Sequence, residues 1–160
     1  FQNIAIHDID SIEHRLWFGT RAGVFIYSSI QSQLMQMSDV GRKNFPEQLR
    51  NVVSLEQYGS SIYVVSDMGI VEFDIEEKEW NLIFTSGIYS NKDVYSMALN
   101  DKFIFLGVED GLIKINKKTG LVRDYVFSFI GRVNEIILDG KEIWLGTSNG
   151  LIKFLWKRHL

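Results

Sequence analysis

Residue types that bind divalent metals occur together in one short stretch near the start of the chain. The stretch 7–14 contains His7, Asp8, Asp10, Glu13 and His14. In a turn between two strands the two imidazoles could come together, but no third histidine lies nearby and the spacing matches no zinc signature. Carboxylates are also ordinary turn residues. We therefore predict no metal site and no cofactor.

Local catalytic motifs are absent from the sequence. It contains no G-x-S-x-G elbow, no H-E-x-x-H and no glycine-rich phosphate loop with a lysine. Cysteine is absent too, which excludes thiol catalysis and thiolate metal sites. We predict that this segment is not an enzyme.

The composition predicts a globular domain built from strands. Of 160 residues, 46% are hydrophobic and 23% are charged, with 19 Ile and 12 Val against 3 Ala. β-Branched residues favour strands, so a helical bundle is excluded. The net charge of −3 and the lack of a basic stripe give nucleic-acid binding no support. No apolar run approaches the roughly 20 residues that cross a bilayer, so we expect membrane attachment only through a longer parent chain.

Four segments of the sequence superimpose without gaps. They are 16–24 (LWFGTRAGV), 62–70 (IYVVSDMGI), 104–112 (IFLGVEDGL) and 143–151 (IWLGTSNGL). The eighth position is always glycine, at Gly23, Gly69, Gly111 and Gly150, with intervals of 46, 42 and 39 residues. This period is typical of a four-stranded propeller blade. We therefore predict an all-β fold, a β-propeller of four repeat units.

Each unit reads as an antiparallel blade of up to four strands. The blades are expected at about 1–38, 50–85, 93–128 and 132–160, in a single propeller domain. Asp110-Gly111 and Asn149-Gly150 predict type I′ hairpin turns, whose two central residues both have positive φ. Only 156–160 follow the third strand of the last unit, so that unit has no secure fourth strand.

The second strand of each unit carries an aromatic residue followed, two residues later, by glycine in three of the units. The rings are Trp17, Tyr63, Phe105 and Trp144, and the glycines are Gly19, Gly107 and Gly146. Residues two apart share one face of a strand. We predict that each ring packs on the neighbouring blade and that each glycine lets that blade approach closely. Val65 replaces the glycine in the second unit, where the packing should differ.

The segments LWFGTRAGVFIY and IWLGTSNGLIKF resemble the two-component-regulator propeller repeat, a Leu-Trp-Phe/Leu-Gly-Thr strand followed by two variable residues and Gly-Leu. The resemblance covers all four units, strongly in the first and last and weakly in the second. It implies the periplasmic or cell-surface ligand-sensing propeller of a sensor or hybrid histidine kinase anchored in the inner membrane. The kinase would lie outside this segment.

The resemblance also implies the ligand class and the assembly. The ligand would be a carbohydrate, in particular an oligosaccharide, and propellers of this family have many more than four blades. Because an unclosed propeller leaves blade faces uncovered, we expect this segment to be completed by remaining blades of its parent chain or by a second copy in a homodimer. Two other readings stay open: a structural protein–protein interaction propeller, and a propeller-based polysaccharide lyase or glycosidase whose site is assembled from separate blades.

One candidate ligand-binding surface is formed by the hairpin position two residues before the repeated glycine. The glycine that follows is the same in all four repeats, whereas the residue at this position differs from repeat to repeat. It is Arg21, Asp67, Glu109 or Ser148. Equivalent turns of successive blades lie on one rim, where propellers commonly bind ligands. Exposed hairpin tips also vary without any function, and the sequence leaves both explanations open.

Two inter-blade connections supply further candidates. The connection 38–50 contains Arg42, Asn44 and Phe45, and the connection 85–93 contains Tyr89 and Asn91. A ring beside hydrogen-bonding groups suits a sugar, whose C–H face packs on the ring while its hydroxyls need paired donors and acceptors. The alternative is that both connections are solvated linkers.

Overall fold

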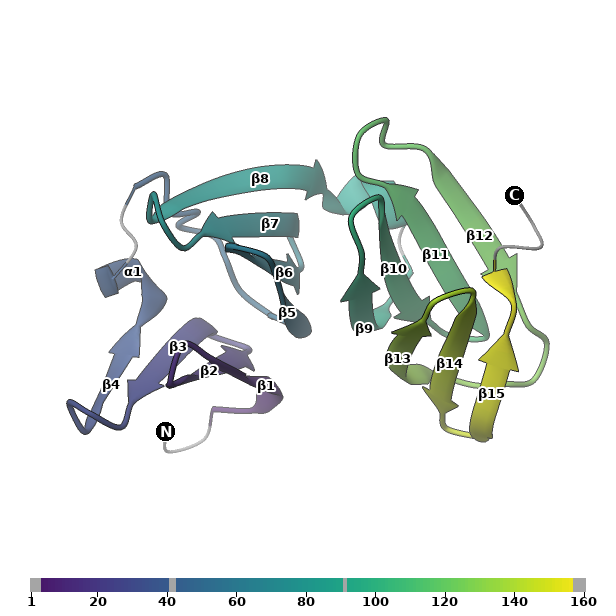
Figure 1. Ribbon diagram of the computed structural model, residues 1–160, viewed down its shortest axis with the longest axis horizontal. Helices are drawn as coiled ribbons and strands as arrows, with labels where there is room; N and C mark the ends of the chain where they lie inside the picture. Colours follow the sequence, from purple (N-terminus) through teal and green to yellow (C-terminus); the bar gives the residue numbers. More distant parts are fainter. Residues whose placement is uncertain (1–3, 41–42, 91, 157–160) are drawn as a thin grey trace. The chain divides into compact units, whose positions relative to one another are not determined.

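The computed structural model describes residues 4–40, 43–90 and 92–156. The chain divides into two compact units, Phe1–Ile88 and Tyr89–Leu160. Each unit contains two antiparallel sheets in which strands that are consecutive in sequence lie side by side (Figure 1). We number these sheets blades one to four in chain order.

The first unit holds blades one and two. Blade one consists of β1 (Ile6–Ile12), β2 (Arg15–Thr20), β3 (Gly23–Ser28) and β4 (Gln33–Gln36), followed by a single helical turn, α1 (Met37–Val40). Blade two consists of β5 (Ser54–Tyr58), β6 (Ser61–Ser66), β7 (Gly69–Asp74) and β8 (Glu79–Thr85). The short 3-10 helix η1 (Ser86–Tyr89) follows β8.

The second unit holds blades three and four. Blade three consists of β9 (Val94–Leu99), β10 (Phe103–Val108), β11 (Gly111–Asn116) and β12 (Val122–Val126). Blade four consists of β13 (Val133–Asp139), β14 (Glu142–Thr147) and β15 (Gly150–Phe154). These sheets confirm the all-β class and the four repeat units, and the described residues of blade four contain no fourth strand. None of the described helices is long and apolar enough to cross a membrane.

The hairpins at the repeated glycines differ from the type I′ turns that the sequence predicts. Thr147 pairs with Gly150, so the two loop residues are Ser148 and Asn149, and the glycine opens the next strand instead of occupying the turn. Of the eight loop residues in the four equivalent hairpins, only Asp110 has positive φ. The type I′ assignment is therefore wrong. A hydroxyl closes the turn: Thr147 Oγ1 donates to the carbonyl of Gly150 at 2.8 Å and accepts from the amide of Asn149 at 3.2 Å.

The hydrophobic core of each unit lies between its two blades. In the first unit, residues of blade one pack against residues of blade two; the buried members include Trp17, Val24, Ile26, Val52, Val64 and Phe73. In the second unit, the buried members from blade three and from blade four include Phe105, Leu112, Val133, Ile136, Leu145 and Trp156. Each core is thus an inter-blade interface.

Glycine on the second strand allows the following blade to approach, as predicted. A Cβ built on Gly19 would lie 2.8 Å from Cγ1 of Val52, which precedes blade two. A Cβ on Gly107 would collide with the carbonyl of Val133, the first residue of blade four. Gly19 lies opposite Asp8, whose carboxylate accepts from the Leu55 amide at 2.8 Å and from Ser54 Oγ at 3.0 Å. Ser96, opposite Gly107, donates to the Val133 carbonyl at 2.7 Å.

The rings of the motif pack in the predicted way in only two of the blades. Trp17 is buried, 6.0 Å from the ring of Phe73, and Phe105 is buried, 5.3 Å from the ring of Trp156. Trp144 is only partly buried because no sheet follows blade four among the described residues of its unit. The ammonium of Lys153 instead lies 5.2 Å from the centroid of its ring. Tyr63 is also only partly buried, and desolvation together with its hydrogen bond to Glu72 raises the pKa of its phenol.

Comparing two of the repeated glycines distinguishes the cost of backbone strain from the cost of a packing collision. Gly69 and Gly150 have similar φ values, 136° and 131°, which side chains rarely adopt, so alanine should cost about 1–3 kcal/mol of strain at either position. A Cβ on Gly69 would also collide with the Phe84 carbonyl of β8, whereas a Cβ on Gly150 would meet nothing within 4 Å. We expect Gly69→Ala to lower the free energy of unfolding by about 1–3 kcal/mol more than Gly150→Ala, measured by urea denaturation. Equal losses would contradict the assigned packing.

Candidate functional site

The hairpin tips of the first unit meet the end of the connection 38–50 and the residue that follows it, Asn51. The amide of Asn51 donates to the Arg21 carbonyl at 3.0 Å, and its side-chain nitrogen donates to the Asp67 carboxylate at 3.0 Å. Arg21 and Arg50 line one open depression of about 430 Å³. Arg50 and Asp67 line another of about 470 Å³. The predicted residues Arg21 and Asp67 therefore flank the same segment, and Arg50 joins them.

The hairpin tips of the second unit have a matching arrangement around Arg132. Its amide donates to Ser148 Oγ at 3.0 Å, and its carbonyl accepts from the Ser148 amide at 2.9 Å. Its Nε lies 4.0 Å from the Glu109 carboxylate, and both side chains are exposed. Each pair of predicted tip residues is thus brought together within its own unit. A ligand shared by Arg21, Asp67 and Glu109 stays a prediction.

The loop candidates before blade two are held against β8. Asn44 donates to Glu79 Oε1 at 2.6 Å, and the ring of Phe45 packs edge-on against Trp80 at 5.6 Å. Lys43, 2.7 Å from the Glu79 carboxylate, has its pKa raised by the hydrogen bond and charge of Glu79. Arg42, another predicted residue, lies outside the described residues.

The loop before blade three offers little exposed surface at its predicted aromatic residue. Tyr89 is buried in η1, and its carbonyl accepts from the amide of Lys92 at 3.1 Å. Asn91, which the sequence paired with it, lies outside the described residues. Tyr89 therefore presents no open ring face for a sugar.

Two of the residues with metal-binding side chains near the start of the chain, His7 and Asp8, have structural partners. His7 Nδ1 lies 2.9 Å from the Val52 carbonyl, and Asp8 bonds to blade two as described above. In the part of the chain that the structure describes, no three His, Asp or Glu side chains come close enough to hold a metal ion.

A larger pocket, which we call the turn pocket, lies at the other end of β10 from Glu109. It has a volume of about 640 Å³ and lies entirely within the second unit. The residues that line it are Leu99, Asn100, Asp101, Lys102, Phe103, Leu138, Gly140 and Trp156. They come from the β9–β10 turn, from the β13–β14 region and from the residues after β15. The turn pocket therefore joins blade three to blade four.

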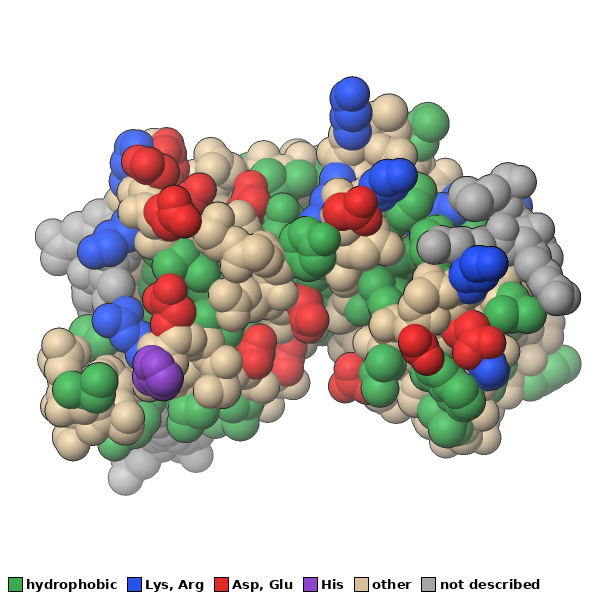
Figure 2. All heavy atoms as spheres, viewed as in Figure 1, with side chains coloured by type: hydrophobic (Ala, Val, Ile, Leu, Met, Phe, Trp, Pro, Cys, Tyr) green, Lys and Arg blue, Asp and Glu red, His purple; other side chains and the backbone are tan. Residues whose placement is uncertain are grey.

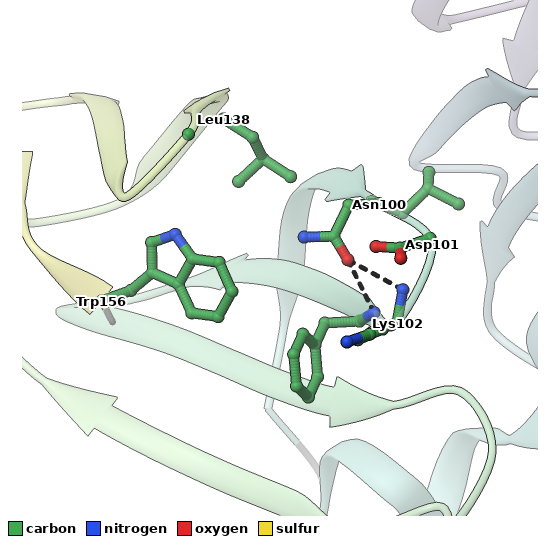
Figure 3. A pocket seen from close by; sticks show the side chains of 8 residues that line it. Asn100, Asp101, Lys102, Leu138 and Trp156 are labelled. Atoms are coloured by element: carbon green, nitrogen blue, oxygen red, sulfur yellow. Dashed lines mark hydrogen bonds between the residues drawn. The ribbon is translucent and has the colours of Figure 1, made fainter. Parts of the chain in front are cut away.

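Two rings and a set of polar turn groups give the turn pocket its chemistry. Phe103 and Trp156 pack edge to face, with ring centroids 5.6 Å apart. Asn100 Oδ1 accepts from the amides of Lys102 and Phe103, both at 2.9 Å, and its amide nitrogen is directed to the side of Trp156 (Figure 3). Asp101 and Lys102 are exposed at its edge. Phe103 is half-buried, whereas Trp156 is almost fully buried. The pocket thus combines the accessible part of the Phe103 ring with donors and acceptors for hydroxyl groups.

Sequence reasoning missed the turn pocket because its residues are far apart in the chain. Asn100 and Asp101 read as an ordinary turn, and Trp156 follows the last repeat, where no internal pattern applies. The only available signal was a tryptophan just outside the repeat.

Comparison with solved structures identifies the fold. The extracellular domain of BT3049 from B. thetaiotaomicron, assigned as a hybrid two-component system, matches with a TM-score of 0.70 and 20% identity over 93% of this chain and 22% of its own. The extracellular domain of BT4673 from the same organism, assigned as a one-component system, matches with a TM-score of 0.66 and 21% identity over 93% of this chain and 21% of its own. The fold is a β-propeller.

A designed protein has the same fold at nearly the same length. The computationally designed Ika4 protein matches with a TM-score of 0.67 and 15% identity over 96% of this chain and 92% of its own. By contrast, this chain spans about a fifth of the two bacterial extracellular domains. No protein-family model matches the sequence, and no curated protein matches it. These similarities establish the propeller fold alone.

The turn at the pocket depends on one side-chain acceptor. Asn100→Ala removes both hydrogen bonds to the turn amides and should lower the free energy of unfolding by about 1–2 kcal/mol, whereas Asn100→Asp keeps the acceptor and should cost less. Asn116 makes the same contacts, at 3.0 Å, to the amides of Lys118 and Thr119 outside the pocket, so Asn116→Ala is the matched control. Urea denaturation measures all three, and an Asn100→Ala variant as stable as the parent would contradict this role.

Proposed function

We propose that this chain is part of an extracytoplasmic sensory propeller that binds a carbohydrate and relays binding to a histidine kinase elsewhere in its parent protein. The chain itself contributes binding and no catalysis. The proposal is carried by the turn pocket, where Phe103 and Trp156 lie beside the Asn100 amide. It is supported by the propeller fold shared with two extracellular domains from sensory systems and by the repeat motif in the sequence.

The pocket chemistry suits a sugar better than a purely apolar ligand. The C–H face of a pyranose packs on an aromatic ring, while its hydroxyls need directional partners such as an amide, a carboxylate and an ammonium. Asn100, Asp101 and Lys102 supply these groups on one turn. A volume of about 640 Å³ is within the range of pockets that bind small ligands.

Because the pocket lies between blades three and four, a bound ligand can change how the two blades are arranged. A ligand held there touches the β9–β10 turn of blade three as well as Leu138 and Trp156 of blade four. It therefore favours arrangements in which the two blades are close. A ligand that binds one arrangement more tightly than another shifts their populations, and this is the energetic requirement for signalling to a distant domain.

Paired variants distinguish the turn pocket from the hairpin tips as the binding site. Asp101→Ala/Lys102→Ala changes two exposed side chains of the pocket, and Glu109→Ala changes an exposed tip at the other end of β10. The variants are compared in calorimetric titrations with oligosaccharides that bind the unsubstituted 160-residue chain. We expect the double variant to weaken binding at least about tenfold and Glu109→Ala to leave it unchanged. The reverse result would move the site to the hairpin tips, and binding of no oligosaccharide would overturn the proposed function.

A second proposal concerns the face of blade four that carries Trp144. Ile137 and Leu151 are 58% and 70% exposed there, whereas Leu112, at the position equivalent to Leu151 in blade three, is fully buried by blade four. Hydrophobic side chains reach the surface over β13–β15 (Figure 2). In the parent protein a further blade would cover this face, and in the isolated chain a second copy would do so. This surface is also the feature that favours the alternative function of a protein–protein interaction propeller.

Sedimentation equilibrium tests this covering surface. We expect the 160-residue chain to form a reversible dimer at micromolar concentration, and Leu151→Lys, which places a charge in the contact, to shift it to monomer. Lys141→Glu, a charge change on the exposed β13–β14 turn, is the control and should not alter association. If the unsubstituted 160-residue chain were a stable monomer, free of aggregation, this would contradict the proposal.

A further inference from the structure

Lys114 occupies a core position that is aliphatic in the equivalent strand of blade one. It lies on β11 opposite Phe105, as Ile26 lies on β3 opposite Trp17. Ile26 is fully buried, and Lys114 is only 7% exposed. A lysine in such a position loses most of its hydration, which is costly unless other groups compensate for its charge.

The compensation comes from aromatic rings. The ammonium of Lys114 lies 4.8 Å from the ring centroid of Phe103, 5.6 Å from that of Trp156 and 5.7 Å from that of Tyr125. Cation–π contacts of this kind are attractive but leave the net charge in place. Among the described residues no carboxylate lies within ion-pair distance of this ammonium. Lys114 is thus a nearly buried cation without an anionic partner in the described structure.

Two of the three caging rings also line the turn pocket. Phe103 and Trp156 contact the Lys114 ammonium and form part of the pocket wall. Lys114 itself does not line the pocket, so its charge acts on a ligand through these two rings. At the pocket edge the charges of Asp101 and Lys102 oppose each other, and Lys114 adds a positive potential. This attraction is screened less than it would be in bulk water, because the rings between the ammonium and the pocket are apolar.

We propose that the turn pocket selects an acidic saccharide, one whose ring carries a carboxylate, and that Lys114 is the group that selects it. This inference rests on the proposed carbohydrate-binding function and adds the charge of the ligand to it. The sugar ring would pack on the half-buried ring of Phe103, with its carboxylate on the side of Lys114. Lys114 is then a specificity-determining residue that acts through the rings and not by direct contact.

Blade four provides a matched comparison for Lys114. Lys153 occupies the equivalent position opposite Trp144, with its ammonium 5.2 Å from that ring. It is exposed, and it pairs with the Glu142 carboxylate at 2.7 Å. Lys153 thus has the same residue type, strand position and ring contact, but it is compensated by an anion, and the ring that it contacts does not line the turn pocket. Its replacement controls for the loss of a lysine at this position.

The test uses trisaccharides in matched pairs with galacto, gluco and manno backbones, each pair differing only in a carboxylate or a hydroxymethyl group at C6. Binding to the parent chain, Lys114→Met and Lys153→Met is measured by isothermal titration calorimetry, and circular dichroism checks that each variant is folded. In at least one pair we expect the unsubstituted 160-residue chain to bind the acidic member at least about tenfold more tightly than the neutral member. Lys114→Met should remove this preference while its Kd for the neutral member stays within about threefold, and Lys153→Met should retain the preference.

The possible failures are distinguishable. If the parent chain binds neutral and acidic members equally, or if Lys114→Met keeps the acidic preference, the inference about Lys114 is wrong and the carbohydrate-binding function stands. If no member of any pair binds, both the inference and the proposed function are overturned. Should Lys114→Met not fold, Lys114→Arg replaces it: the cation is retained there, so the acidic preference must persist in that variant for the inference to hold.

Discussion

The close approach of one blade to the next at a glycine is the contact on which each unit depends. At Gly19 and at Gly107 the space that a side chain would fill is taken by the first residues of the following blade. The residue opposite each glycine, Asp8 or Ser96, then hydrogen-bonds to that blade. With the backbones this close, the rings of Trp17 and Phe105 become buried. The core is therefore a consequence of inter-blade contact and not of any one sheet.

The candidate site draws on the same interface. Trp156 packs on Phe105 in the core of the second unit and also lines the turn pocket with Phe103. A change in the distance between blades three and four would therefore alter both the packing of the core and the shape of the pocket. Under the proposed function, ligand binding and blade packing would be coupled through this side chain, and such coupling is what a sensory domain requires.

The sequence predicts the elements well because the repeat carries their pattern, and it predicts the site poorly because the site lies outside the repeat. The glycine period located all four sheets, and the glycine two residues after the ring correctly indicated close approach at Gly19 and Gly107. The predicted turn type was wrong because the repeated glycine lies outside the turn, as the first residue of the next strand. At Gly150 the φ of 131° is a value that side chains rarely adopt, so this position still favours glycine. Arg132 and Trp156 were missed, and Arg50 was not named although it lies in the predicted connection 38–50, since the partners of all three are set only by the tertiary fold.

The open outer edge of blade four has a practical consequence. β8 passes over Gly69 and β12 passes over Gly111, whereas a Cβ on Gly150, whose φ of 131° is close to the 136° of Gly69, would meet nothing within 4 Å. Among the described residues no strand pairs with the outer edge of β15, so a short extended peptide could add there as an antiparallel fourth strand. A peptide tethered to another molecule could recruit this chain through that edge, which makes blade four a natural place to split the protein into two complementing fragments.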